Sequence, residues 1–246
     1  MEFAKRISKN HDGAMFLSSF GFMLFGPVLL LIPFFLLALN YNPLVLFTQE
    51  YLQSSSFTID SLIADGASKI LLITFMAVIF FKELLENLRR FRKEWVMNLT
   101  YIVGGMISMF ILLAVLNVIY TFFGIEGDSA NQQILIEATN SKAKPFMFFM
   151  IVIAAPFIEE MIFRKFIFGF CEKTMKLSKW WAFAISTIAF AAVHVMTDVD
   201  SFIFIFQYLV LSGVISLSYV LSKKNIFVPM GIHFINNLIS FIEIAL

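Results

Sequence analysis

The chain has 246 residues, of which 60% are apolar and only 14% are charged, and its formal net charge is +1. Soluble globular domains carry about 25% charged residues, so this composition excludes an ordinary soluble protein. It predicts an all-α fold, a polytopic helical bundle in the lipid bilayer. The single cysteine excludes an intrachain disulfide. The basic residues are scattered beside apolar segments, so we expect no nucleic-acid partner.

Seven segments are apolar over a length that can cross a bilayer, which takes roughly 20 residues in a helix. They are Met15–Leu39, Ile63–Phe81, Leu99–Phe123, Phe146–Phe170, Trp180–Met196, Phe202–Leu221 and Ile226–Leu246. The first follows basic residues, as a signal peptide does, but it is longer than a signal h-region, so we interpret it as a retained span. The second has a short apolar core, and Lys82–Trp95 should continue it as a charged helix at the interface.

Lysine and arginine gather in alternate connections, and cytoplasmic loops are the ones enriched in them. The basic connections hold Lys5, Arg6, Lys9, Lys82, Arg89, Arg90, Arg92, Lys93, Lys173, Lys176, Lys179, Lys223 and Lys224. The opposite connections are richer in acidic residues, with Glu50, Asp60, Glu126, Asp128, Glu137, Asp198 and Asp200. We therefore predict a cytoplasmic N-terminus and an external C-terminus.

Two adjacent carboxylates lie inside the fourth apolar segment, where ionisable side chains are costly and are functional candidates. Glu160 and Arg164 are four residues apart and share a helix face, so they should form an ion pair. Glu159 points about 100° around the helix and stays free to act. Pro156 leaves the Val152 carbonyl without its usual donor and should kink the helix. The alternative interpretation is a purely structural Glu–Arg pair that holds helices together.

Three further polar residues lie in the later spans. His194 ends an apolar run, and taken alone it is more typical of a satisfied interfacial residue. His233 and Asn237 are four apart on one helix face, and such a pair can simply join helices by hydrogen bonds. Counting 1.5 Å per residue, however, Glu159, His194 and His233 all fall near the middle of a bilayer about 30 Å thick. The matched depth predicts one active site within the membrane.

Here the sequence resembles a known family. Glu159-Glu160-x-x-x-Arg164, Phe190-x-x-x-His194 and His233-x-x-x-Asn237 are similar, in order and spacing, to the three motifs of the CAAX-protease and bacteriocin-processing (Abi) intramembrane proteases. The resemblance covers about residues 146–240. On this basis we expect one integrated membrane domain with two regions. Residues 1–145 form the N-terminal spans and loops, and residues 146–246 form the catalytic helical core. It also implies residence in a bacterial cell membrane.

The resemblance implies a role for each motif residue. Glu159 would be the general base, and His194 would position or polarise the water. His233 and Asn237 would stabilise the oxyanion, and Glu160 with Arg164 would support the site. Buried donors of this kind act most strongly in a water-poor cavity.

The sequence leaves open whether the reaction needs a zinc ion. Glu159, His194 and His233 could supply the two-histidine, one-glutamate set of catalytic zinc. The chain lacks the His-Glu-x-x-His pattern, and a glutamate that serves as the base is not free to be an ordinary ligand. We therefore favour a metal-independent reaction in which glutamate activates water.

The expected activity is an intramembrane endopeptidase whose partners are membrane-associated or lipid-modified peptides. The resemblance leaves three substrate classes open: prenylated CAAX tails, bacteriocins and peptide signals. One alternative is a catalytically silent membrane scaffold or bacteriocin self-immunity protein of the same fold. Another is a transporter, which would favour internal repeats and paired broken spans; the sequence has neither. Nothing in the sequence indicates an oligomeric state.

Overall fold

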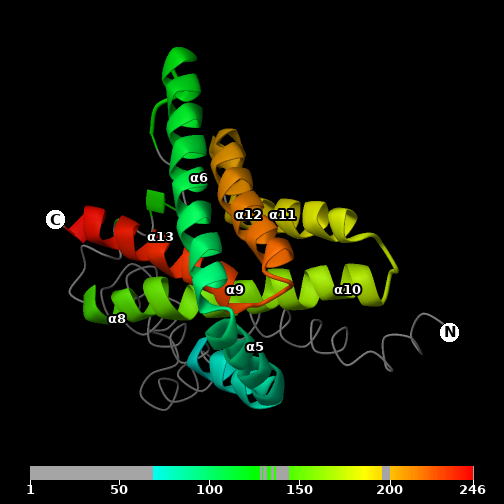
Figure 1. Cartoon of the computed structure of the whole chain (residues 1–246). Coiled ribbons are helices and arrows are strands. Elements are labelled where there is room, and N and C mark those ends of the chain that lie inside the picture. Colours follow the sequence, from blue (N-terminus) through cyan, green and yellow to red (C-terminus); the bar gives the residue numbers. More distant parts are fainter. Residues whose placement is uncertain are drawn as a thin grey trace, which may run out of the picture.

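The structure is a computed structural model that describes residues 69–127, 144–195 and 200–245, together with Ser129, Gln132, Gln133 and Ile136. Within these residues the regular elements are all helices, and the described part of the chain contains no strand. The all-α expectation is therefore confirmed (Figure 1). The first predicted span and residues 63–68 of the second lie outside the described residues.

Four described helices are long and apolar enough to cross a membrane: Trp95–Phe122, Lys144–Lys173, Phe202–Leu221 and Phe227–Ile244. They coincide with the third, fourth, sixth and seventh predicted spans. The fifth predicted span corresponds to α11, which covers Lys179–Val195, 17 residues or about 25 Å of helix. The described part of the second is an apolar helix over Lys69–Ile79.

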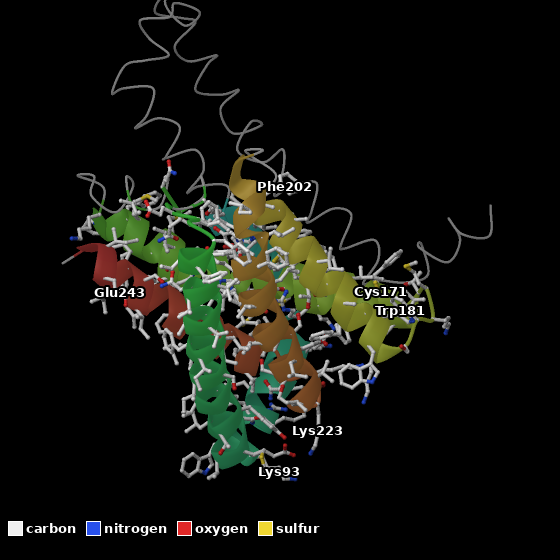
Figure 2. All side chains as sticks on the ribbon, turned by 90° about the horizontal axis from the view of Figure 1, so that it is seen from above. Lys93, Cys171, Trp181, Phe202, Lys223 and Glu243 are labelled. Atoms are coloured by element: carbon white, nitrogen blue, oxygen red, sulfur yellow. The ribbon has the colours of Figure 1, made fainter. Side chains whose placement is uncertain are left out.

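A charged helix precedes the span Trp95–Phe122, as the sequence predicts. Helix α5 covers Phe81–Lys93 and α6 covers Trp95–Phe122, with Glu94 between them in a non-helical conformation. Figure 1 shows α6 and α12 (Ile205–Leu221) standing side by side, and the two helices pack on each other. In Figure 2, Lys93 and Lys223 lie at one end of this pair and Phe202 at the other. Two predicted basic connections thus share one end of the bundle.

The helix that carries both central glutamates is interrupted twice by wider turns. Its segments are α8 (Lys144–Phe148), π-helix η2 (Phe149–Ala154), α9 (Ala155–Glu160), π-helix η3 (Met161–Ile167) and α10 (Phe168–Lys173). The expected disturbance at Pro156 takes the form of the first π segment, in which the Ala155 N–H bonds to the carbonyl of Met150. Pro156 then lies in the first turn of α9, where a helix needs no backbone donor. Such π turns occur frequently at functional sites.

The remaining helices close around this interrupted helix. Its phenylalanines Phe163, Phe166 and Phe168 are buried with Phe190 of α11 in the main apolar cluster. After the short 3-10 helix η4 (Asp200–Phe204), α12 packs on both α11 and α6. The last helix, α13 (Phe227–Ala245), contacts α6, α9 and η2. This arrangement brings α9, α11, α12 and α13 together at the level of the predicted site.

A polar clasp fixes where α13 begins. The Asn225 side chain donates to the backbone carbonyl of Asn87 at 3.0 Å, and the Ile226 N–H donates to Asn87 Oδ1 at 3.2 Å. All four groups belong to buried residues, where a satisfied hydrogen bond specifies position strongly. The clasp joins α5 to the start of α13, and so it sets the register of the helix that carries His233.

Candidate active site

Glu160 and Arg164 form the predicted ion pair, and both side chains are completely buried. Arg164 Nε lies 3.1 Å from Glu160 Oε2. The guanidinium also donates from Nη2 to Ser212 Oγ at 3.3 Å and lies 5.0 Å from the centroid of the Phe190 ring. A buried arginine needs such partners because an unpaired charge in this environment is very costly. The pair ties the π segment η3 to α12 and α11.

The second oxygen of Glu160 holds His233. Glu160 Oε1 lies 2.8 Å from His233 Nδ1, and because a carboxylate in an ion pair accepts, Nδ1 is the donor. Glu160 thus connects a guanidinium on its own helix to an imidazole on α13. The motif spacing predicted the first contact. It did not predict the second, since nothing in the sequence says which face of α13 meets α9.

Glu159 faces two imidazoles. Its Oε2 lies 3.6 Å from His194 Nε2 and 3.8 Å from His233 Nε2. The same oxygen is buried and makes no hydrogen bond to any residue that the structure describes, although the Glu159 side chain as a whole is 21% exposed. Three titratable side chains from three helices therefore lie close together. The distances from Glu159 Oε2 to the two imidazole nitrogens are slightly longer than direct hydrogen bonds.

The His194 ring is held on three sides. Its Nδ1 lies 2.8 Å from the Phe190 carbonyl, which can only accept, so Nδ1 carries the proton and Nε2 faces Glu159. Phe190 stacks on the His194 imidazole with ring centroids 4.3 Å apart. Tyr208 of α12 also stacks on the His194 imidazole, with centroids 4.9 Å apart. The hydroxyl of Tyr208 is hydrogen-bonded to Ser129 Oγ at 2.7 Å. The orientation of His194 is therefore set by its neighbours.

Asn237 lies apart from this contact set. Its Nδ2 donates to the Ile151 carbonyl in η2 at 2.9 Å, and its Oδ1 accepts from Asn236 at 3.3 Å. The amide therefore satisfies a backbone group beside the π segment, where irregular hydrogen bonding leaves carbonyls in need of donors. Its spacing from His233 places it on the same side of α13, one turn farther along.

The polar contribution of α12 was missed at the sequence level. Tyr208, Ser212 and Ser216 follow one another at intervals of four and share one helix face. Each has a partner at the site or next to it, and Ser216 Oγ accepts from Thr187 of α11 at 3.1 Å. A polar stripe at four-residue spacing within an apolar span is a signal in the sequence that identifies the face turned toward the other polar helices.

The predicted zinc ligands approach one another at a single oxygen of Glu159. In the described part of the chain, no group of three or more His, Cys, Asp or Glu side chains has the arrangement that could hold a metal ion. Glu159 presents a single oxygen to both imidazoles, and the second nitrogen of each ring is engaged by Phe190 or Glu160.

The segment that carries these residues is similar to a known protein family. Residues 141–239 match the family described as type II CAAX prenyl endopeptidase Rce1-like. The resemblance inferred from the motifs is thereby confirmed. The matched segment contains every predicted site residue from Glu159 to Asn237, and it begins beside the interrupted helix and ends within α13.

Two curated proteins are similar to the chain. It is 30% identical over 136 residues to the membrane-embedded CAAX protease MroQ of Staphylococcus aureus, covering 55% of this chain and 53% of MroQ. It is 33% identical over 112 residues to YdiL of Bacillus subtilis, whose name describes a candidate membrane peptidase, covering 44% of each protein. The chain thus spans about half the length of the curated relatives that it matches. No solved structure matches it significantly.

Proposed function

We propose that this protein is an intramembrane endopeptidase that hydrolyses peptide bonds of membrane-associated or lipid-modified peptides by glutamate-activated water. The observation that carries the proposal is the convergence of His194 Nε2 and His233 Nε2 on one buried oxygen of Glu159, at 3.6 and 3.8 Å. Polar groups separated by slightly more than a hydrogen bond are suited to sharing a water molecule.

The hydrogen bonds around the two rings suggest different roles for them. In neutral His194, Nδ1 holds the proton on the Phe190 carbonyl, so Nε2 presents a lone pair that accepts from water. His233 also donates from Nδ1, to Glu160. When its Nε2 is protonated too, the imidazolium is balanced by the carboxylates of Glu160 and Glu159. His233 is therefore the ring better suited to donate a hydrogen bond to developing negative charge.

The proposed reaction follows from these roles. Glu159 accepts a proton from a water molecule that His194 orients, and the water oxygen bonds to the carbonyl carbon of the substrate. His233 donates from Nε2 to the resulting oxyanion, and protonated Glu159 then gives its proton to the leaving amine as the C–N bond breaks. General-base catalysis of this kind contributes about 10²–10⁴-fold in rate, and an oxyanion donor contributes about 10²–10³-fold.

Glu160, Arg164 and Asn237 act on this site through other residues. Glu160 orients His233, and Arg164 pairs with the buried Glu160 carboxylate and fixes its position. Asn237 donates to the backbone of η2, and this contact favours a role in holding the interrupted helix against α13. The oxyanion role that the motif implies for Asn237 would require its amide to leave Ile151.

The test compares membrane peptides from cells that carry the wild-type protein with those from cells that carry Glu159→Gln. Glu243→Gln provides the matched control, because Glu243 lies on α13 with an exposed side chain. The proposal expects uncleaved precursors to accumulate only in Glu159→Gln cells. Identical peptide profiles for all three proteins would contradict it and would favour the silent scaffold.

A further inference from the structure

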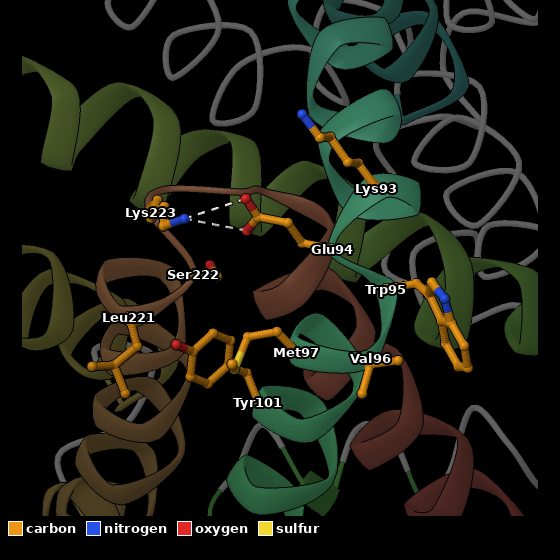
Figure 3. Close-up of a pocket in the computed structure, with 9 residues that line it drawn as sticks. All are labelled: Lys93, Glu94, Trp95, Val96, Met97, Tyr101, Leu221, Ser222 and Lys223. Carbon is orange, nitrogen blue, oxygen red and sulfur yellow. Dashed lines mark hydrogen bonds and ion pairs between the residues drawn. The ribbon is translucent and has the colours of Figure 1, made fainter.

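A cavity opens between the basic ends of α6 and α12, away from the candidate active site. Its volume is about 440 Å³, and Figure 3 shows the side chains around it. It is lined by Lys93, Glu94, Trp95, Val96, Met97, Tyr101, Leu221, Ser222 and Lys223. Glu94 and Lys223 face each other across it, with Lys223 Nζ 3.2 Å from Glu94 Oε1. One side of the cavity is therefore polar and the other apolar.

The charge around this cavity is positive. Among the residues that the structure describes, Lys93 and Lys223 line it together with one carboxylate, that of Glu94. Arg90 adds a third cation, because its guanidinium donates to the Lys223 carbonyl at 3.4 Å. The Glu94–Lys223 pair is exposed, at 46% and 76%, and exposed pairs contribute only about 0–1 kcal/mol. A phosphate could therefore replace Glu94 as the partner of Lys223 at little cost.

An apolar groove continues from the cavity along the same two helices. It has a volume of about 310 Å³ and shares Tyr101 and Leu221 with the cavity. Between Tyr101 and Leu112 it follows α6 for roughly 16 Å at 1.5 Å per residue. This length matches one leaflet of a hydrocarbon core about 30 Å thick. The groove thus has the length and polarity of a site for one acyl chain.

Two adjacent glycines of α6 border the groove and have different roles. A Cβ on Gly105 would lie 2.5 Å from the Ile232 side chain, so this glycine allows α6 to approach α13 closely. A Cβ on Gly104 would meet no atom within 4 Å. Gly104 therefore leaves space in the groove that the packing of the described helices does not require.

We infer that the cavity and groove together bind one anionic phospholipid of the bilayer. The headgroup phosphate lies at Lys223 and Lys93, and one acyl chain lies along Gly104 between α6 and α12. Clusters of basic residues at the membrane surface attract anionic lipids at about 1 kcal/mol for each Lys or Arg. Gly104 and Ser108 also form a small-x-x-x-small pattern that can join two helices, but that pattern gives no reason for the basic cavity at the end of the groove.

The test uses the whole 246-residue chain, purified in detergent and titrated with phosphatidylglycerol or with phosphatidylcholine. Native mass spectrometry counts the lipid bound to each protein molecule. We expect phosphatidylglycerol to be retained in preference to phosphatidylcholine. Lys223→Gln should weaken its binding about fivefold. Lys176→Gln is the matched control, because Lys176 and Lys223 are both exposed lysines at positive φ, 61° and 55°, and it should bind as the wild type does.

The groove is tested separately by Gly104→Leu, with Ala114→Leu as the control at an exposed position of α6 outside the groove. Only Gly104→Leu should reduce lipid retention. Equal binding of the two lipids would overturn the inference, as would equal losses in Lys223→Gln and Lys176→Gln. Unchanged lipid binding in Gly104→Leu with a changed proportion of dimer would assign the groove to a second copy of the chain instead.

Discussion

Glu160 Oε1 lies 2.8 Å from His233 Nδ1, although the two residues are 73 positions apart. The contact joins the interrupted helix to α13 inside the membrane-spanning part of the molecule, and Arg164 completes it from the other carboxylate oxygen. A fully buried charge network of this kind specifies one arrangement of helices. The geometry of the candidate site thus depends on a carboxylate that is expected to take no part in proton transfer.

Replacement of Glu159 by glutamine should abolish peptide hydrolysis and leave the fold unchanged. Glutamine keeps the size of the side chain but cannot take a proton from water, and loss of a general base costs about 10²–10⁴-fold in rate. The measurement is cleavage of a candidate peptide by purified protein in detergent, with thermal unfolding in parallel. Wild-type rates in a folded Glu159→Gln protein would remove Glu159 as the base.

Arg164→Ala should instead reduce stability. It leaves the buried carboxylate of Glu160 without its cation, and breaking a buried pair costs about 3–5 kcal/mol. Glu94→Gln breaks an exposed pair with Lys223 and should cost no more than about 1 kcal/mol. Thermal unfolding of both variants in the same detergent provides the comparison, and equal stabilities would refute the structural role of Arg164.

Tyr208 should act as a positioning residue for His194. Tyr208→Phe keeps the stacked ring and loses the hydroxyl that is hydrogen-bonded to Ser129, so its turnover should stay within severalfold of wild type. Tyr208→Ala leaves the imidazole stacked on Phe190 alone and should lower kcat with little change in KM. Steady-state kinetics separates these outcomes. Equal losses in the two variants would assign the effect to the hydroxyl group.

Hydrolysis should survive exhaustive chelation if glutamate alone activates the water. Purified protein is dialysed against a strong chelator, and its residual activity is compared with that of a sample to which zinc has been restored. Activity lost on chelation and recovered with zinc would require Glu159, His194 and His233 to rearrange around a metal ion.

The predicted membrane orientation rests on the basic connections and can be tested. A reporter fused after Lys176 should lie in the cytoplasm, and one fused after Asp200 should lie outside, because lysine and arginine are retained on the cytoplasmic side. Reporter activity on each side of the membrane measures this directly. The opposite result at both positions would invert the predicted topology.

Local patterns in the sequence predicted the local features of the structure. Apolar runs gave the four long described spans, and four-residue spacing gave the Glu160–Arg164 pair. Contacts between helices were harder to anticipate, because they depend on which faces meet. The bond from Glu160 to His233 and the stacking of Tyr208 on His194 are of this kind. The fifth apolar run was likewise matched, by α11 over Lys179–Val195.

The two π segments have a consequence for how this site tolerates insertions and deletions. A π turn holds one residue more than an α turn, so loss of one residue from η3 would restore a regular α-helix and keep the span intact. A deletion between Glu160 and Arg164 would shorten their separation from four residues to three, and because each residue accounts for about 100° of rotation in an α-helix, the direction of Arg164 relative to Glu160 would change. The directions of the acidic pair and its arginine are therefore set by the phase of the helix as well as by residue identity. The π segments should accordingly tolerate substitutions of similar size far better than changes in length.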